Sequence, residues 1–427
     1  MSNSIRLPPV IVIGGLPNAL SVARSLGRQG IKVYAINDEP TIVGYSRHCR
    51  LIRLPVEANL EGVWTRFLLS SDSDFLRGAV LLACCDEGIK LMAEHRQALL
   101  EKFRLDDSDP EAQLCMLNKL STYQHAVAAG VPTPRFWLAN SRPRILALRE
   151  ELVFPLLVKP SLSHQFCGHF GGQKFFVVND LEQLLDAFTR VSKTELETML
   201  VEQIPGPDSL LCSYYTYLDA DSTPLFDFTK RVVRRFPVGM GNGTYHITDW
   251  NPEVKEAALK LCRFVGLRGL ANVEFKRDLR DGRLKLIECN ARFTAANCLV
   301  AESGYDLASF VYYRVVGKPS RPLGKYATGK RLWYPYADWK AYRELNRRGE
   351  LTFRQWVKSI MHPFILPYFR WDDPFPTLAA VVQRPVEFAK RVFRKGWHIL
   401  RMGRRALRQF QAPIHQKGNA SQATRRS

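Results

Sequence analysis

The sequence lacks the features that mark several common classes of protein. The 427-residue chain has no run of about 18 apolar residues, which excludes a helix that spans a bilayer. Its amino terminus has no apolar stretch of signal-peptide length, so we expect a cytoplasmic protein. The nine cysteines form no CxxC pair and no metal-finger spacing, and we interpret them as reduced thiols. The hydrophobic fraction of 46% excludes disorder as the main state.

Acidic residues are scarce at the carboxyl end of the chain. The whole sequence has 61 Lys and Arg against 41 Asp and Glu, a net charge of +20. From Arg384 to Ser427, Glu387 is the one acid against twelve basic residues, so this segment carries +11. Beyond Pro385 apolar and basic residues recur as in a basic amphipathic helix, and a polar tail that we expect to be disordered follows.

Such a helix would suit an anionic membrane surface, and the protein would then be peripheral at the inner face of the membrane. A solvated helix that packs on the core and a contact with nucleic acid are the alternatives. Nucleic acid is the least favoured partner, because the sequence contains no recognised nucleic-acid-binding module.

The amino-terminal part has the pattern of a parallel α/β unit. An apolar strand over 9–13 ends at Gly14, a helical pattern follows, and a second apolar strand covers 31–36. Residues 79–84 predict another buried strand, and Asp86 follows it at the edge where sheets of this kind bind ligands. A dinucleotide is disfavoured, because the glycine spacing G-x-G-x-x-G is absent after the first strand.

A predicted hairpin holds the strongest chemical signal in the sequence. Its strands cover 270–278 and 283–290, with the turn at Asp281. Glu274 and Glu288 are equally far from this turn and therefore lie opposite each other on one face. Like charges in these positions repel unless a cation lies between them. In the alternative register, shifted by one residue, Glu274 points to solvent.

Two further polar residues continue the same face. Asn290 and Arg292 follow Glu288 at intervals of two residues, the period with which strand side chains alternate. Two carboxylates and an amide oxygen are hard oxygen ligands of the kind that Mg²⁺ uses when it also binds nucleotide phosphates. The planar guanidinium of Arg292 would suit a phosphate group.

The residues upstream of this hairpin occur in an order that indicates a family. Lys119 begins a predicted helix and Lys159 ends a buried strand. A loop with Gly171-Gly172 follows, and then Glu202 on another strand. Together with Glu-x-Asn-x-Arg in the hairpin, this order resembles the ATP-grasp superfamily from about residue 117 to 319. More narrowly, the chain is similar to bacterial carboxylate-amine ligases of this superfamily that are related to D-aspartate ligase.

The resemblance implies a mixed α/β and α+β architecture in four parts. A Rossmann-like parallel α/β domain over 1–115 would precede an ATP-grasp domain with antiparallel sheets over 116–320. An extension rich in aromatic residues and proline, over 321–384, would pack on the core. The basic helix and the tail would cover 385–427.

The resemblance also implies how a nucleotide would bind. ATP and Mg²⁺, for which Mn²⁺ could substitute, would be the cofactors. Lys119 and Lys159 would contact the ATP phosphates, with Lys159 also near the adenine, and Asp208 would bind the ribose hydroxyls. The backbone of the adenine-binding hinge would be that of Glu202, Gln203 and Ile204.

The same resemblance assigns the metal and the catalytic groups. The metal ligands would be Glu274, Glu288 and Asn290. Arg292 and Lys159 would be catalytic, with Arg292 stabilising the transferred phosphoryl group. The phosphate-covering loop, Ser161 to Gly172, is poorer in glycine than is usual in the superfamily.

The implied activity is ligation of a small-molecule carboxylate to an amine through an acyl phosphate, with release of ADP and phosphate. Substrate contacts would come from a basic strand and the glycine loop after it, at Arg231, Arg234, Gly243 and Thr244. Exposed strand charges are the alternative explanation of the two arginines. The rival function is a catalytically weak ATP-binding sensor or a membrane-surface adaptor of the same fold.

Overall fold

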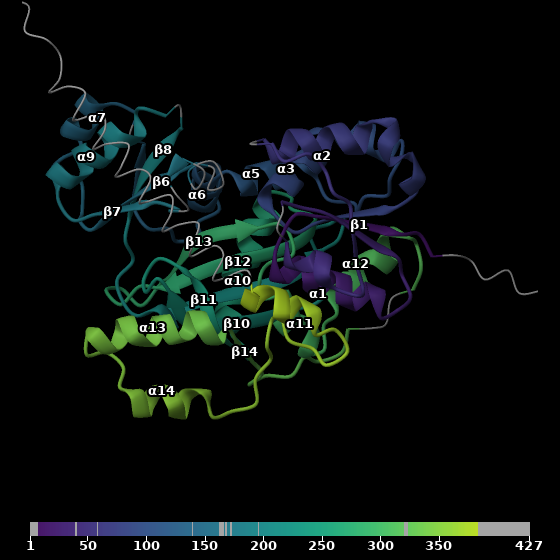
Figure 1. The fold of residues 1–427 in the computed structure, drawn as a ribbon. Coiled ribbons are helices and arrows are strands. Elements are labelled where there is room, and N and C mark those ends of the chain that lie inside the picture. The colour runs from purple at the N-terminus through teal and green to yellow at the C-terminus, as the bar shows by residue number, and fades with distance from the viewer. Residues whose placement is uncertain are drawn as a thin grey trace, which may run out of the picture. The chain divides into compact units, whose positions relative to one another are not determined.

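The computed structural model describes residues 7–38, 41–57, 59–138, 140–161, 166, 169–170, 173–194, 196–319 and 323–382. The chain divides into two compact units, 1–376 and 377–427, and all three sheets lie in the first (Figure 1). The predicted basic helix and tail over 385–427 lie outside the described residues. No helix in the described part of the chain is long and apolar enough to cross a membrane.

The first sheet is parallel, with the strand order β3-β2-β1-β4. Its strands are β1 (Val10–Ile13), β2 (Val33–Ile36), β3 (Arg50–Leu51) and β4 (Val80–Ala83). Val10 and Val12 belong to one hydrophobic core and Ile11 and Ile13 to another, because successive side chains point to opposite faces. Burial on both faces explains the continuous apolar runs and confirms the predicted parallel unit.

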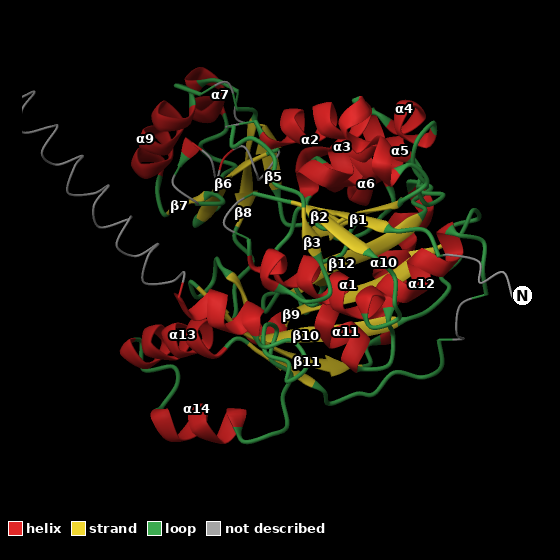
Figure 2. Ribbon diagram, turned by 45° about the vertical axis from the view of Figure 1, so that its right-hand side comes forward, coloured by secondary structure: helices red, strands yellow, loops and turns green. Residues whose placement is uncertain are grey.

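Helices cover both faces of this sheet (Figure 2). On one face lie α1 (Pro17–Gly27), α11 (Asn297–Glu302) and α12 (Leu307–Val315). On the other face lie α2 (Leu60–Leu69), α3 (Asp86–Glu94) and α4 (Arg96–Leu100). The short 3₁₀ turns are η1 (Ile42–Tyr45) and η2 (Ser71–Leu76). The amino-terminal sheet thus shares a core with helices formed almost 300 residues later in the chain.

The second sheet is antiparallel, with the order β5-β8-β6-β7. Its strands are β5 (Phe136–Leu138), β6 (Leu156–Pro160), β7 (Phe176–Val178) and β8 (Thr198–Glu202). Helices α7 (Arg142–Ala147) and α9 (Leu181–Val191) share its core. Helices α5 (Pro110–Leu117) and α6 (Lys119–Ala128) precede it in the chain and belong to another core. Asp180 caps α9, because its Oδ1 accepts the backbone N–H of Gln183 at 2.8 Å.

The third sheet is antiparallel and has six strands in the order β13-β12-β9-β10-β11-β14. Its strands are β9 (Leu211–Leu218), β10 (Phe228–Phe236), β11 (Asn242–Asp249), β12 (Gly269–Arg277), β13 (Leu284–Asn290) and β14 (Arg331–Trp333). The turn η3 (Asp208–Leu210) precedes β9, and α10 (Pro252–Phe264) connects β11 to β12. The antiparallel sheets of the predicted fold class are therefore present.

Strands β11 and β14 of the third sheet were not expected from the sequence. Gly243 and Thr244, interpreted as part of a glycine loop, lie in β11, which pairs with β10 on one side and β14 on the other. The turn before β11 is confined to the residues around Gly239, whose φ of +81° favours glycine. Thr244, Tyr245 and His246 are all buried, so both faces of this part of the strand are covered.

The extension after residue 320 adds a strand and two helices to this sheet. Helix α13 (Pro335–Arg347) runs along β10 and β11, and α14 (Phe353–Ile360) follows it (Figure 1). Asp338 of α13 is fully buried and holds this arrangement. It accepts hydrogen bonds from Arg234, through Nε at 2.8 Å and Nη2 at 2.9 Å, and from Thr244, Trp333 and Trp356.

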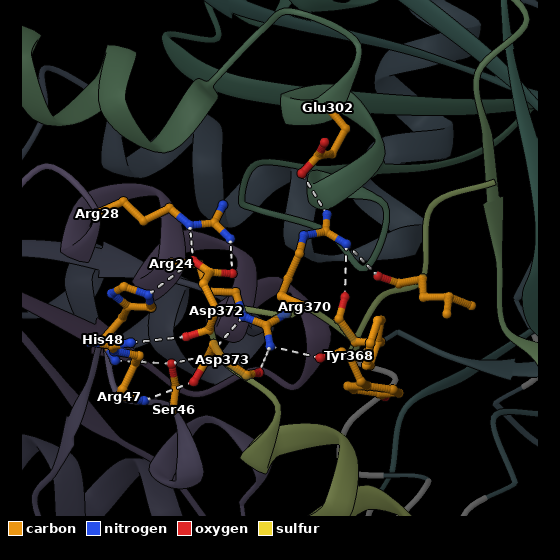
Figure 3. A network of polar contacts seen from close by, with 12 residues as sticks. Arg24, Arg28, Ser46, Arg47, His48, Glu302, Tyr368, Arg370, Asp372 and Asp373 are labelled. Carbon is orange, nitrogen blue, oxygen red and sulfur yellow. Dashed lines mark hydrogen bonds and ion pairs between the residues drawn. The ribbon is translucent and has the colours of Figure 1, made fainter. Parts of the chain in front are cut away.

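A second buried acid ties the end of the extension to the amino-terminal part (Figure 3). Asp373 accepts hydrogen bonds from Arg24 Nε at 2.8 Å, Ser46 Oγ at 2.7 Å and the backbone N–H of Arg47 at 3.0 Å. Its neighbour Asp372 pairs with Arg28 through two hydrogen bonds of 2.9 Å near the surface. Residues 372–373 therefore fix the carboxyl end of the first unit against α1.

Candidate active site

The two predicted metal-binding glutamates are cross-strand neighbours in the third sheet. Glu274 of β12 pairs with Glu288 of β13, so the register predicted from the sequence is confirmed and the shifted alternative is wrong. The row continues across the sheet, because Glu274 pairs with Ser213 of β9 and Ser213 with Lys230 of β10. Hydrogen-bond register thus places two carboxylates and an ammonium on one line of one face.

A cavity of about 230 Å³ opens over this row. Its basic lining residues are Lys119, Lys159, Lys174, Lys230 and Arg235. Against these five basic groups stand two acids, Glu274 and Glu288, so the lining carries an excess of positive charge. A cavity with this charge favours an anionic ligand.

Lys119 and Lys159 reach the cavity from the elements that the sequence predicted. Lys119 is the first residue of α6, and its Nζ lies 3.7 Å from Glu288 Oε2. Lys159 lies on β6 with 8% of its surface exposed, and its Nζ lies 3.5 Å from the hydroxyl of Tyr123. Burial lowers the pKa of Lys159, while the charge of Glu288 acts in the opposite direction.

The two glutamates have different electrostatic surroundings. Burial and the neighbouring charge of Glu288 raise the pKa of Glu274. Burial acts in the same direction on Glu288, but Lys119 and Lys174 outweigh it and lower the pKa of Glu288. Two close carboxylates resist simultaneous ionisation unless positive charge is supplied.

The donor set fits a divalent cation. Glu288 Oε1 accepts from Asn290 Nδ2 at 3.2 Å, and Glu274 Oε1 accepts from Asn272 Nδ2 at 3.2 Å. The buried Oδ1 of Asn272 has no partner among the described residues. No cluster of three or more His, Cys, Asp or Glu in the described ranges could bind a metal alone. Two carboxylates and an amide instead suit Mg²⁺, which completes its shell with phosphate and water.

Arg292 is held by the amino-terminal part of the molecule. Its Nε lies 2.5 Å from Oδ1 of Asp86, the first residue of α3. Asp86 was predicted from the sequence to lie at the ligand-binding edge of the first sheet. Burial alone would raise the pKa of Asp86, but the charge of Arg292 keeps it below its ordinary value. The ion pair orients the guanidinium at the junction of the first and third sheets.

The predicted hinge lines a narrower pocket of about 80 Å³ beside the cavity. Gln203 and Ile204 line it together with Lys159. The side chain of Glu202 is buried against Arg135 and Arg280, which both donate to it. Only the backbone of Glu202 could therefore act in a hinge, and the predicted adenine contacts stay a prediction.

Asp208 is engaged within the chain at both carboxylate oxygens. Arg235 Nε donates to Oδ1 at 2.6 Å, and the N–H of Gly239 donates to Oδ2 at 3.1 Å. A ribose would have to compete with these donors. The predicted ribose contact of Asp208 is not tested by this arrangement.

The structure separates the four predicted substrate-binding residues. Gly243 lines the cavity, whereas Arg234 and Thr244 are bound to Asp338 and lie outside it. Arg231 is 43% exposed at its side chain and pairs with Asp249 at 3.2 Å. The register of β10 shifts on both sides of Arg234, which interrupts the simple alternation that the sequence suggested.

Among the residues that line the cavity, four with a basic or imidazole side chain were not assigned a role from the sequence, namely Lys174, Lys230, Arg235 and His246. Lys230 and Arg235 lie on the same basic strand as Arg231. The pairing of Lys230 with Ser213, which in turn pairs with Glu274, would have identified Lys230 as a cavity residue. His246 gave no signal, because β11 was not predicted. Burial and the charge of Lys230 lower the pKa of His246 to about 3, and its buried Nδ1 has no partner among the described residues.

Comparison with known sequences supports the resemblance. Residues 248–318 match the family described as carbamoyl-phosphate synthase L chain, ATP binding domain. The chain is 26% identical over 365 residues to D-aspartate ligase of Enterococcus faecium (strain Aus0004), which covers 80% of this chain and 85% of that protein.

Solved structures share the fold. The L-amino acid ligase from Bacillus licheniformis superposes with a TM-score of 0.56 and 18% identity, over 73% of this chain and 75% of that one. N5-carboxyaminoimidazole synthetase from Staphylococcus aureus, complexed with ADP, gives a TM-score of 0.55 and 18% identity over 75% and 80%. The resemblance to the ATP-grasp superfamily and the predicted fold class are confirmed.

Proposed function

We propose that this chain is an ATP-dependent ligase that forms a carbon–nitrogen bond between a small-molecule carboxylate and an amine. The observation that carries the proposal is the pair Glu274 and Glu288, which face each other in a cavity lined mainly by basic side chains. Two facing carboxylates repel each other unless a cation binds between them, and the basic side chains of the lining repel each other unless an anion binds. A nucleoside triphosphate with its bound metal ion would supply the anion and the cation. The similarity to D-aspartate ligase and to an L-amino acid ligase supports this reaction class.

The nucleotide would lie between the second and third sheets. Lys119 and Lys159 would bind its phosphates, and Lys174 extends the same basic lining. The backbone of Gln203 and Ile204 would contact the adenine in the narrower pocket. Asp208 would bind the ribose after release from Arg235.

Glu274, Glu288 and Asn290 would hold Mg²⁺ or Mn²⁺, which would neutralise phosphate oxygens when bound. The reaction needs such a site, because a carboxylate is a poor electrophile until it is converted to an acyl phosphate. The basic residues would neutralise the crowded oxygens of the phosphates, and the buried walls would exclude water. Arg292, oriented by Asp86, would stabilise the transferred phosphoryl group. An amine would then attack the acyl carbon and displace phosphate.

The substrates would enter beside the carboxyl edge of the first sheet. Gly243 lies in the cavity wall. Arg231 follows Lys230 on β10 and therefore points to the opposite face of the sheet, where it pairs with Asp249. Its predicted contact with a substrate carboxylate would therefore lie outside this cavity. Arg234 and Thr244 would contribute indirectly, through the anchor at Asp338.

A catalytically weak ATP sensor is the second candidate. Two groups of the proposed machinery already have partners in the chain, since Arg292 is paired with Asp86 and Asp208 with Arg235. A protein that could not release these pairs would bind the nucleotide without turnover.

The basic segment over 385–427 carries a separate proposal, a contact with an anionic membrane surface. Eleven basic residues against Glu387 are the support for it. Sedimentation with phosphatidylglycerol vesicles at low and high salt tests the contact. If deletion of residues after Pro385 leaves binding unchanged, the segment does not bind the membrane.

The ligase proposal is tested first by ATP binding, measured by thermal shift with and without Mg²⁺. ADP release is then measured in the same samples with a panel of amino acids and other small carboxylates, D-aspartate among them. A Mg²⁺-dependent shift with ADP release for one acid supports the ligase. A shift without ADP release favours the sensor, and the absence of any shift contradicts both.

A further inference from the structure

A buried lysine connects the predicted hinge to the strand that carries Glu274. Lys276 lies two residues after Glu274 on β12, so both side chains point to the same face of the third sheet. It is 6% exposed. Its Nζ donates to the backbone oxygens of Ile204, at 2.9 Å, and of Gly206, at 2.6 Å.

The surroundings of Lys276 do not explain the cost of its burial. Burial lowers its pKa to about 8, and Arg235 adds to the effect. The nearest acids are already engaged, Asp208 by Arg235 and Asp278 by Arg280. A buried ammonium whose direct partners are carbonyls is more costly than an apolar side chain of the same length.

The segment that Lys276 contacts has few backbone donors of its own. Residues 204–207 read Ile-Pro-Gly-Pro, and the two prolines have no N–H to donate. Lys276 therefore supplies donors to two peptide planes at once and fixes their direction. Lys276 lines the pocket of about 80 Å³ together with Gln203 and Lys159. The base of the nucleotide would bind in this pocket.

We infer that Lys276 is a positioning residue of the nucleotide site, which holds the base-binding segment in register with the metal-binding strand. This inference rests on the proposed function. The nucleotide site then has two parts whose ligand affinity responds differently to substitution. Binding of the base depends on Lys276, whereas binding of the phosphates depends on Lys119, Lys159 and Lys174.

The experiment compares two probes on one set of variants. ADP reports on base and phosphate binding, and inorganic tripolyphosphate reports on phosphate binding alone. Both affinities are measured by calorimetry on the full chain for Lys276→Met, which removes the donors, and for Lys276→Arg, which keeps them. Lys102→Met is the matched control, because Lys102 Nζ likewise donates to a backbone oxygen, that of Ser70, at 2.6 Å but belongs to the amino-terminal part.

We expect Lys276→Met to weaken ADP binding about tenfold or more, the loss that follows from disordering the base contacts. Tripolyphosphate binding should change by less than about twofold, a difference within the scatter of a neutral substitution. Lys276→Arg should restore most of the ADP affinity, and Lys102→Met should leave both affinities unchanged. Amide exchange of the free protein should accelerate at Ile204 and Gly206 in Lys276→Met and stay slow in Lys276→Arg.

Three results would overturn the inference. Unchanged ADP binding in Lys276→Met would show that the base needs no fixed segment, and equal weakening of both probes would show general damage to the cleft. Wild-type protein that binds neither probe would contradict the proposed function itself, without reference to any variant. Should Lys276→Met fail to fold, Lys276→Gln takes its place with the same expected order of affinities.

Discussion

Two groups of acidic side chains, one in the cavity and one in the anchors of the extension, differ in how their charge is balanced. Asp338 accepts five hydrogen bonds, two of them from one guanidinium. Asp373 accepts three, including one from Arg24. Among the described residues, Glu274 and Glu288 each accept one side-chain hydrogen bond, from an amide, and face each other.

The difference separates acids that complete the fold from acids that await a ligand. When a buried carboxylate that is paired with a guanidinium is removed by mutation, the guanidinium stays buried without a counterion. Substitution of Glu274, whose pKa is raised by burial and by the charge of Glu288, removes a repulsion instead. Substitutions of Asp338 and of Glu274 should therefore change stability in opposite directions.

Asp338→Ala should have the largest effect, because it leaves the guanidinium of Arg234 buried without its partner. We expect a loss of about 3–5 kcal/mol in the free energy of unfolding. Urea denaturation followed by fluorescence measures it. A loss below about 1 kcal/mol, the value of an exposed ion pair, would contradict the role of Asp338 as an anchor.

Glu288→Gln should reduce turnover about 10²–10³-fold, the typical cost of removing one preorganised charged group from a reaction centre. The side chain keeps nearly the same volume. Because Lys119 and Lys174 lower the pKa of Glu288, the folded state favours its charge, and the free energy of unfolding without ligand should decrease at neutral pH. ADP release and urea denaturation on the same preparation test both parts, and wild-type turnover would contradict the metal assignment.

Asp373→Asn should be milder than the loss of Asp338, because the amide keeps the shape and part of the hydrogen bonding. Charged hydrogen bonds contribute about 1.5–3 kcal/mol, and we expect a loss in this range. Thermal denaturation measures it. A larger effect than that of Asp338→Ala would reverse the expected order of the two anchors.

Asp372→Ala should have the smallest effect, below about 1 kcal/mol, because its partner Arg28 is 40% exposed and Asp372 itself 48%. The hydrogen bond from Arg28 lowers the pKa of Asp372 to about 2. Its contribution to stability is thus present above the ordinary aspartate pKa near 4 and is lost as the pH falls through about 2. Wild type and variant should converge in stability in acid, and a constant difference from pH 7 to 2 would contradict the pairing.

Local patterns were enough to predict three of the four strands of the first sheet and the pairing of Glu274 with Glu288. Continuous apolar runs mark strands that are buried on both faces. The register shift between Glu274 and Phe275, which lies between this pair and the turn at Asp281, was not predicted. Lys119 and Lys159 were assigned from the resemblance to the ATP-grasp superfamily, and the structure places both in the cavity.

Other parts of the site depend on contacts that no local pattern contains. Arg234 binds Asp338, which lies 104 residues away, and the register shifts in β10 redirect the basic strand. His246 became visible only once β11 was known to pair with β10. Lys276 was not assigned from the sequence, because its partner Ile204 lies 72 residues away in the chain.

The tie between Arg24 and Asp373 has a consequence for synthesis of the protein on the ribosome. The two residues are 349 positions apart. At about 5–20 residues per second, roughly 20–70 s pass between their translation, and during this time Arg24 lacks its counterion. The amino-terminal sheet can collapse early, but its first helix is completed by one of the last segments of the first unit to emerge. A nascent chain that stops short of Asp373 thus lacks the acid that pairs with Arg24.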